Sequence, residues 1–205
     1  MNDNKDHWYD GWLYDVLIAP HQDSLFAGIK ELIEPGSRVI DIGCGTGRLP
    51  LFLAGRCRSV LGVDLSKRNI DRAQLLLSRK LIPNVSFRHA GGEAALSGGV
   101  DRYDYAVLTY VLHEVREEER VKLLLAAARA ADTLILGDYL VPAPGGFSGA
   151  LAEVVEFAAG AEHYENYRDF MRGGGIRGLA VKAGLTVVRE IRGRPAAGHL
   201  AVLTR

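Results

Sequence analysis

The stretch VIDIGCGTGRLP, residues 39–50, constrains the fold of this chain more than any other segment. An apolar, β-branched run leads into Gly43, Gly45 and Gly47, and an apolar run typical of a helix begins at Leu49. A glycine-rich turn between a strand and a helix lets the bare backbone approach a neighbouring group or ligand closely. The segment therefore predicts a strand, a loop and a helix, and its glycine spacing limits what the loop can hold.

Short β-branched runs alternate with helical runs along the rest of the chain. Strands are predicted at 37–43, 58–65, 84–90, 104–112 and 133–140, with helices at 49–56, 67–80 and 117–131. This alternation predicts a parallel sheet with helices on both faces. Two further strands, at 185–193 and 198–205, are too close in sequence for a parallel crossover and must be antiparallel. The predicted fold class is a doubly wound α/β sheet of seven strands, parallel except for a C-terminal antiparallel hairpin.

The chain has 205 residues, of which 48% are hydrophobic, so it can bury one sizeable core, and a single domain over 1–205 is expected. Residues 1–36, rich in aromatic side chains, are expected to form one or two helices over the carboxyl edge of the sheet, as a lid. Residues 141–170 open with prolines and glycines and are expected to form a cap inserted before the last helix.

Charge and cysteine content argue against several classes of protein. Lys plus Arg and Asp plus Glu number 25 each, so no overall field attracts nucleic acid or an anionic membrane. Cys44 and Cys57 form no CxxC pair and follow no secretory signal, so neither a disulfide framework nor a zinc cluster is expected. No apolar run approaches the roughly 20 residues that cross a bilayer. We expect a soluble cytoplasmic protein without nucleic-acid or membrane partners, and its oligomeric state stays open.

The glycine spacing disfavours the common phosphate-binding loops. A dinucleotide fingerprint needs G-x-G-x-x-G, but Arg48 follows Gly47 here, and no G-K-[ST] completes a Walker motif. Asp41, just before the glycines, would repel a pyrophosphate but suits an ammonium group or a water-bridged cation. Asp64, at the end of the second strand, is placed to accept hydrogen bonds from ribose hydroxyls. A nucleoside with a cationic amino-acid tail is S-adenosylmethionine (SAM), the predicted cofactor.

The segments VIDIGCGTG and GVDLS, at this separation, closely resemble the SAM-binding motifs of the class I methyltransferases, and the arrangement predicted above resembles their fold. The resemblance covers most of 37–205. It implies that Asp41 lies near the methionine ammonium, that the loop glycines lie under the cofactor and that Asp64 binds the ribose. The usual adenine-binding acid is replaced by two glycines followed by Glu93, so Glu93 or backbone groups would read the adenine. The other cofactor contacts expected are Cys44, Leu65, Gly92 and Thr109.

The family places its methyl acceptor beyond the fourth strand, where this chain has the turn YVLHEV. This turn resembles the LHH or LHE turn of many small-molecule methyltransferases and lacks the NPPY signature of amino-directed nucleic-acid and protein enzymes. His113 is the leading candidate for a general base or an acceptor-orienting group, because imidazole titrates near neutrality. Its alternative role is a hydrogen bond to the backbone or to the cofactor's carboxylate, and Tyr110 is the second catalytic candidate. The acceptor site is expected to include Tyr9, Tyr14, Tyr139, His163 and Tyr164.

For three neighbouring features, the sequence does not favour a direct catalytic role. Glu117 stands where an H-E-x-x-H zinc helix would need a histidine, so no metal is expected. Asp138 is expected to cap a helix or form a salt bridge, or to face the acceptor. The charged run 116–120 is expected to be a solvated helix start.

The sequence thus predicts a SAM-dependent methyltransferase that transfers a methyl group in line to a small-molecule acceptor. Two alternatives stay open: a non-catalytic SAM-binding or regulatory module on the same fold, and a protein or RNA methyltransferase. The acceptor, and whether its oxygen, nitrogen or carbon is methylated, are not determined by the sequence.

Overall fold

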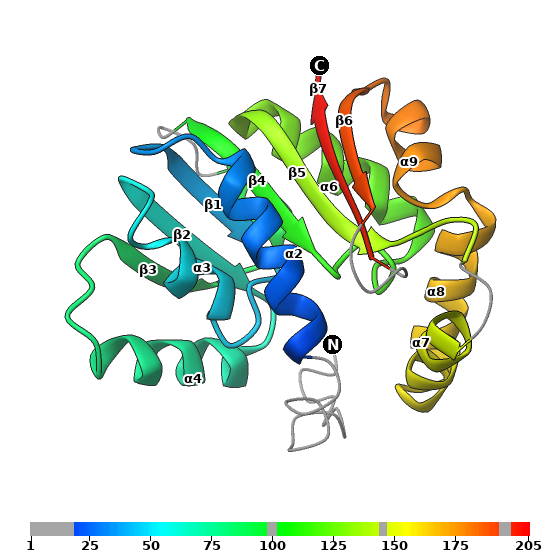
Figure 1. Cartoon of the computed structure of the whole chain (residues 1–205), viewed down its shortest axis with the longest axis horizontal. Coiled ribbons are helices and arrows are strands. Elements are labelled where there is room, and N and C mark those ends of the chain that lie inside the picture. The colour runs from blue at the N-terminus through cyan, green and yellow to red at the C-terminus, as the bar shows by residue number, and fades with distance from the viewer. Residues whose placement is uncertain (1–18, 98–101, 144–146, 193–197) are drawn as a thin grey trace.

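A computed structural model describes residues 19–97, 102–143, 147–192 and 198–205 (Figure 1). The strands are β1 Arg38–Ile42, β2 Ser59–Asp64, β3 Val85–His89, β4 Tyr103–Thr109, β5 Ala131–Tyr139, β6 Thr186–Arg192 and β7 Gly198–Thr204. They form one seven-stranded sheet in the order β3-β2-β1-β4-β5-β7-β6. Strands β1 to β5 pair in parallel, whereas β7 runs antiparallel to both β5 and β6. The predicted fold class is confirmed.

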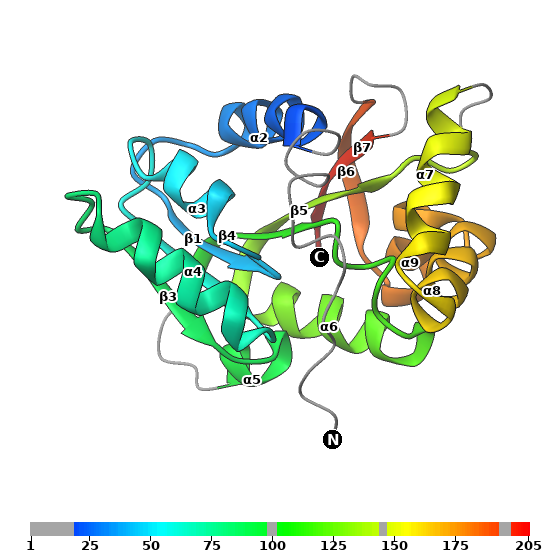
Figure 2. The same cartoon turned by 90° about the horizontal axis from the view of Figure 1, so that it is seen from below.

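Helices cover both faces of the sheet. They are α2 Ala19–Leu32, α3 Arg48–Leu53, α4 Lys67–Ser78, α5 Gly92–Ser97, α6 Glu117–Ala130, α7 Phe147–Ala158, α8 Ala161–Arg172 and α9 Gly175–Ala183. Helices α2, α3 and α4 lie on one face, and α5, α6 and α9 on the other (Figure 2). Helices α7 and α8 pack against each other beside these layers, and α8 also contacts α6 and α9.

The central strands are buried on both faces, as their nearly continuous apolar sequence requires. Alternate side chains of β1 point to opposite faces. Ile40 joins the core under α6, which contributes Leu124, whereas Val39 joins the core under α2, which contributes Ile29. The carboxyl ends of β1, β2, β4 and β5 are thereby fixed at one edge of the sheet.

Two segments are arranged differently from what the sequence suggested. The helix in the described part of 1–36 is α2, which packs on a face of the sheet because Leu25, Phe26 and Ile29 form an apolar stripe on one side of it. Residues 1–18 lie outside the described residues. The expected cap is two helices that meet at Gly160, and the second continues to Arg172. No helix among the described residues is long and apolar enough to span a bilayer.

Candidate active site

The glycine loop joins β1 to α3 in a left-handed backbone conformation. Gly43, Gly45 and Gly47 have φ values of 77°, 52° and 82°, a region that favours glycine. The N–H groups of Gly43 and Cys44 donate to the carbonyl oxygen of Val63 at 2.8 and 3.0 Å. These bonds fix the loop against the carboxyl end of β2.

The three glycines face different surroundings. A Cβ atom at Gly43 would lie 2.3 Å from Val111 Cγ2, and one at Gly47 would lie 2.5 Å from Phe87 Cζ. A Cβ atom at Gly45 would meet nothing within 4 Å. Close packing therefore requires Gly43 and Gly47, whereas Gly45 borders open space that a ligand can occupy.

Asp64 ties the loop to the start of α4. Its Oδ2 accepts from the Gly45 N–H and its Oδ1 from the Ser66 N–H, both at 2.8 Å. The Ser66 hydroxyl in turn accepts from the Asn69 N–H at 3.3 Å and caps α4. A carboxylate has about four acceptor positions, so Asp64 can hold the loop and still accept from a ribose hydroxyl.

Two buried polar atoms beside the loop lack partners. Asp41 is 2% exposed, and its Oδ1 has no hydrogen-bond partner among the described residues; the same holds for Thr109 Oγ1 at the end of β4. Burial, reinforced by the nearby Asp64 carboxylate, raises the pKa of Asp41 to about 8. Buried polar groups without partners are uncommon in native proteins and unfavourable. The ammonium group of SAM would give Asp41 a partner, so the residues present fit the predicted cofactor.

The other residues expected to contact the cofactor differ in exposure. Leu65 is 77% exposed directly after Asp64, and Glu93 is exposed in the first turn of α5. Gly92 has a packing role, because a Cβ atom there would lie 2.6 Å from Leu123 Cδ1 of α6. Cys44 is buried, and burial, then the Asp41 and Asp64 carboxylates, raises the pKa of its thiol. The contacts of these residues with the cofactor stay a prediction.

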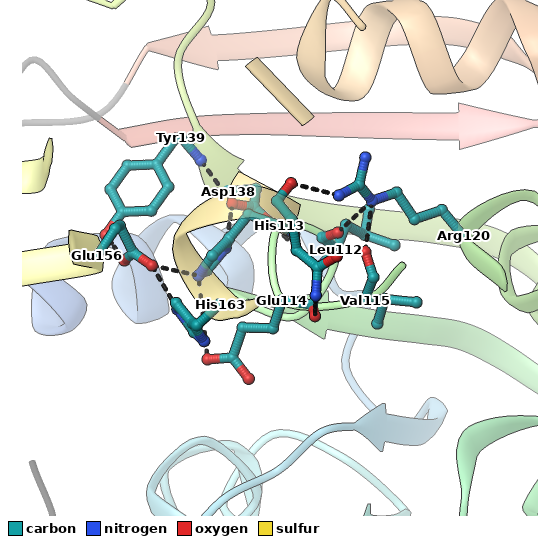
Figure 3. Close-up of polar contacts among 10 residues, drawn as sticks. Leu112, His113, Glu114, Val115, Arg120, Asp138, Tyr139, Glu156 and His163 are labelled. Carbon is teal, nitrogen blue, oxygen red and sulfur yellow. Dashed lines mark hydrogen bonds and ion pairs between the residues drawn. The ribbon is translucent and has the colours of Figure 1, made fainter. Parts of the chain in front are cut away.

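His113 lies in the turn after β4 and is held by Asp138 of β5 (Figure 3). Its Nδ1 and Asp138 Oδ1 are 2.7 Å apart, and both side chains are buried. Asp138 Oδ2 accepts from the N–H groups of Leu112 and His113 at 3.1 and 3.3 Å. One carboxylate thus fixes both the backbone of the turn and the orientation of the imidazole.

Glu156 reaches the same cluster from α7 (Figure 3). Its Oε1 accepts from the Tyr139 hydroxyl at 2.6 Å, and its Oε2 bonds His163 Nε2 and lies 3.6 Å from His113 Nε2. Glu156 was not predicted from the sequence. The apolar run AEVVEFAAG carries two acids, Glu153 and Glu156, and only the fold shows that Glu156 is the buried one, which needs a polar partner.

The cluster is electrostatically coupled. Burial alone would lower the pKa of His113, but the carboxylates of Asp138, Glu156 and Glu114 outweigh it and raise that pKa to about 9. Burial would raise the pKa of Glu156, but His113, His163 and the Tyr139 hydroxyl lower it overall. At neutral pH, His113 is therefore an imidazolium beside two buried carboxylates.

Arg120 anchors the turn that carries His113. Its Nε donates to the carbonyl oxygens of Leu112 and Val115 at 2.9 and 2.7 Å, and its Nη2 donates to the Asn166 carbonyl of α8. Asn166 Nδ2 donates to the Glu114 carbonyl at 2.9 Å. The prediction that 116–120 is only a solvated helix start was therefore wrong for Arg120, which is 1% exposed. Buried carbonyl groups of the turn need donors, and this guanidinium supplies them.

The comparison with protein families agrees with this geometry. Residues 39–132, which run from β1 to the start of β5, match the family model described as a methyltransferase domain. Over this segment, a little under half of the chain, the match agrees with the class I methyltransferase family that the sequence predicted. The cofactor of this family is SAM, as the sequence predicted.

Curated relatives match only parts of this chain. The tRNA (uracil-5-)-methyltransferase homolog A of Mus musculus is 30% identical over 114 residues, which are 55% of this chain and 19% of that protein. The magnesium-protoporphyrin O-methyltransferase of Rhodobacter capsulatus is 43% identical over 72 residues, which are 35% of this chain and 31% of that protein. The matched segments thus span about a third or less of these relatives.

A solved structure shares the fold over most of the methyltransferase. Magnesium protoporphyrin IX methyltransferase from Synechocystis PCC 6803, with bound SAH, has a TM-score of 0.64 and 23% sequence identity. The match covers 93% of this chain and 85% of that chain. The likeness supports the same sheet and helix arrangement along nearly the whole length.

The fold brings most of the predicted acceptor residues together. The His113 ring lies 4.9 Å from the Tyr139 ring and 5.7 Å from the His163 ring, centroid to centroid. Tyr110, with an unusual φ of 56°, places its ring 6.3 Å from His113. The Tyr164 hydroxyl instead donates to Glu153 at 2.8 Å, outside this cluster. The predicted contacts of Tyr9 and Tyr14 lie outside the described residues.

Proposed function

We propose that this methyltransferase transfers the methyl group of SAM to a small-molecule acceptor held between the carboxyl ends of β4 and β5 and helices α7 and α8. The observation that carries the proposal is the buried polar cluster of His113, Asp138, Tyr139, Glu156 and His163. A buried set of directed polar groups suits a small molecule, because a few fixed donors and acceptors can orient it. Val111, in the same turn as His113, packs against Gly43, so the cluster and the cofactor loop share one turn.

The loop side of the site would hold the cofactor. Asp41 would pair with the methionine ammonium, Thr109 would hydrogen-bond the amino-acid part and Asp64 would accept from the ribose. SAM supplies the electrophilic methyl group, and the electrons of the broken carbon–sulfur bond stay on sulfur. The chain's own residues must align donor and acceptor and exclude water.

The cluster side would orient the acceptor. A group with a pKa near 9 keeps its proton at neutral pH, so His113 serves as an orienting group rather than a general base. The rings of Tyr110 and Tyr139, 5.7 Å apart, flank it and give the acceptor an apolar contact. Methyl transfer from a sulfonium does not require a base where the acceptor is already nucleophilic.

RNA is the second candidate acceptor, because a tRNA methyltransferase is among the relatives. Equal numbers of acidic and basic residues make it the weaker candidate, since RNA binding relies on an excess of positive charge. A small-molecule acceptor is favoured by the relatives named for magnesium-protoporphyrin and by the ubiquinone biosynthesis O-methyltransferase of Leptothrix cholodnii.

Transfer of a labelled methyl group from SAM into separate metabolite, tRNA and protein fractions tests the proposal. We expect label in the metabolite fraction, loss of labelling with Asp41→Asn, and normal labelling with Glu118→Gln, an exposed substitution on α6. Label found only in tRNA would establish the second candidate. Tight SAM binding without label in any fraction would refute methyl transfer and leave a SAM-binding module.

A further inference from the structure

Two imidazoles and a carboxylate converge from different elements beside the acceptor cluster (Figure 3). His113 and Glu114 come from the turn between β4 and α6, and His163 comes from α8. One potential ligand atom from each residue lies within 4.8 Å of the other two. The distance between His113 Nε2 and Glu114 Oε1 is 3.9 Å.

This set of donors matches a particular class of ion. Two imidazole nitrogens and one carboxylate oxygen suit divalent transition metals, whereas Mg²⁺ and Ca²⁺ prefer oxygen ligands alone. Zn²⁺ binds such atoms at about 2.0–2.2 Å, which places ligand atoms roughly 3–4 Å from one another. The spacing between His113 and Glu114 already falls in that range, so shifts of less than about 1 Å would close the set around an ion.

Each imidazole is also paired with a buried carboxylate. Asp138 bonds His113 Nδ1 at 2.7 Å, which leaves Nε2 directed toward Glu114 and Glu156. Glu156 bonds His163 Nε2. A carboxylate on the second ring nitrogen is the usual support of a metal-binding histidine, because it fixes the tautomer and the direction of the ring.

The charges and the backbone favour a cation at the same place. Three carboxylates, from Glu114, Asp138 and Glu156, surround two imidazoles, and two of the three carboxylates are buried. A divalent ion would offset this local excess of negative charge. The turn bearing two of the ligand residues is already fixed by hydrogen bonds to Arg120 and Asn166, so little ordering remains for binding.

We propose that His113, Glu114 and His163 bind a divalent transition-metal ion of the zinc type. Binding of the ion would displace the proton that the His113 ring carries in the metal-free protein, because only a neutral imidazole can coordinate a metal. Three protein ligands leave a coordination position open, as in catalytic zinc sites. On the basis of the proposed function, that position takes a hydroxyl oxygen of the acceptor. Coordination releases the hydroxyl proton to solvent, the oxygen lone pair forms the new bond to the methyl carbon, and the carbon–sulfur electrons return to sulfur.

Zinc binding by the EDTA-treated full-length chain, measured by calorimetry and mass spectrometry without SAM, tests the site directly. We expect one Zn²⁺ per chain, and a Co²⁺-loaded form with visible d–d absorption. Asp138→Asn should weaken Zn²⁺ binding about 10–100-fold, the usual effect of losing a supporting carboxylate, and His163→Gln or Glu114→Gln should weaken it more. Glu118→Gln and His89→Gln, two exposed controls, should bind Zn²⁺ like the unaltered chain.

Circular dichroism of each variant separates loss of a ligand from loss of the fold. Absence of stoichiometric Zn²⁺ binding, or equal affinity in the folded ligand variants and the controls, would overturn the metal site. If the EDTA-treated chain still transfers methyl groups, the proposed role of the metal in the transfer is refuted and the proposed function stands. If Zn²⁺ binds as expected but no label is transferred, the proposed function fails alone.

Discussion

Gly36 and Gly45 share a left-handed backbone, with φ values of 82° and 52°, and a Cβ atom at either position would meet nothing within 4 Å. Only Gly45 lies in the loop proposed to hold SAM. Alanine at either position should therefore lower the free energy of unfolding by about 1–2 kcal/mol, the strain of a left-handed non-glycine residue. Only Gly45→Ala should also weaken SAM binding in calorimetry. Equal SAM affinity of the two variants would argue against a cofactor at this loop.

Asp41 gives the protein a pH dependence of defined sign. Its pKa is raised from 3.8 to about 8 by burial and by Asp64, so the folded protein keeps a proton that the unfolded chain releases. The contribution of Asp41 to the free energy of unfolding is therefore full at low pH and falls as the pH rises from about 4 to about 8. Asp41→Asn should gain stability relative to the unaltered chain over this window, measured by urea unfolding at several pH values.

The same group links SAM binding to proton release. Below about pH 8 the ammonium of SAM would displace the Asp41 proton, so the heat of binding should depend on the ionisation enthalpy of the buffer. Asp41→Asn should bind SAM more weakly and lose that buffer dependence. In the urea experiment, a stability difference between Asp41→Asn and the unaltered chain that does not change with pH would contradict the raised pKa of Asp41.

Residue-scale features were predictable where the signal was local. The spacing of Asp41, the glycines and Asp64 can be read directly, because these residues meet at the ends of adjacent parallel strands. His163 was expected in the acceptor site with His113, but Glu156 could not be placed there from sequence, because it reaches His113 from more than 40 residues away. Nothing in the sequence around Glu156 specifies that contact.

At the scale of elements, Arg120 joins α6, the turn after β4 and α8. Arg120→Met would remove the donor to the carbonyls of Leu112, Val115 and Asn166, and each buried carbonyl left unpaired costs about 1–3 kcal/mol. Arg116→Met is the matched control, since Arg116 is exposed and should change stability by no more than about 0.5 kcal/mol. Urea unfolding distinguishes the two, and equal losses would mean that the buried guanidinium is not needed.

Strands and long helices were predicted better than short or inserted elements. Strand β1 is mostly apolar and β-branched, β5 contains the apolar run LIL, and α4 has a cap and an apolar stripe that indicate it locally. Helix α5 was missed because it has only six residues and begins at a glycine. The division of the cap into α7 and α8 at Gly160 depends on packing against α6 and α9, which local sequence does not specify.

At the scale of the whole molecule, residues from β1, β2 and β4 meet in the proposed cofactor site, so a bound cofactor should stabilise the whole sheet. SAM at 100 times its Kd should add about 2.7 kcal/mol to the free energy of unfolding. For a chain of this size that corresponds to a rise in Tm of roughly 5–10 °C. Thermal unfolding with and without SAM measures it, with methionine alone as the control. No shift at saturating SAM would be incompatible with binding to the folded state.

The alternation of strands and helices predicted the sheet, and the residues at the carboxyl ends of β1 and β2 were enough to predict the cofactor. The acceptor side needs the full tertiary arrangement, because it combines the turn after β4 with the end of β5 and with two helices inserted after β5. For this reason the sequence specifies the methyl donor far better than the methyl acceptor.

The attachment of α8 to the His113 turn bears on how an acceptor enters and leaves. Asn166, which binds both Arg120 and the Glu114 carbonyl, lies on the same helix as His163. An outward swing of α8 would therefore withdraw one imidazole and release the turn that carries the other. Opening the site to an acceptor would therefore also disassemble it, so the protein could transfer a methyl group only while α8 is closed over the site.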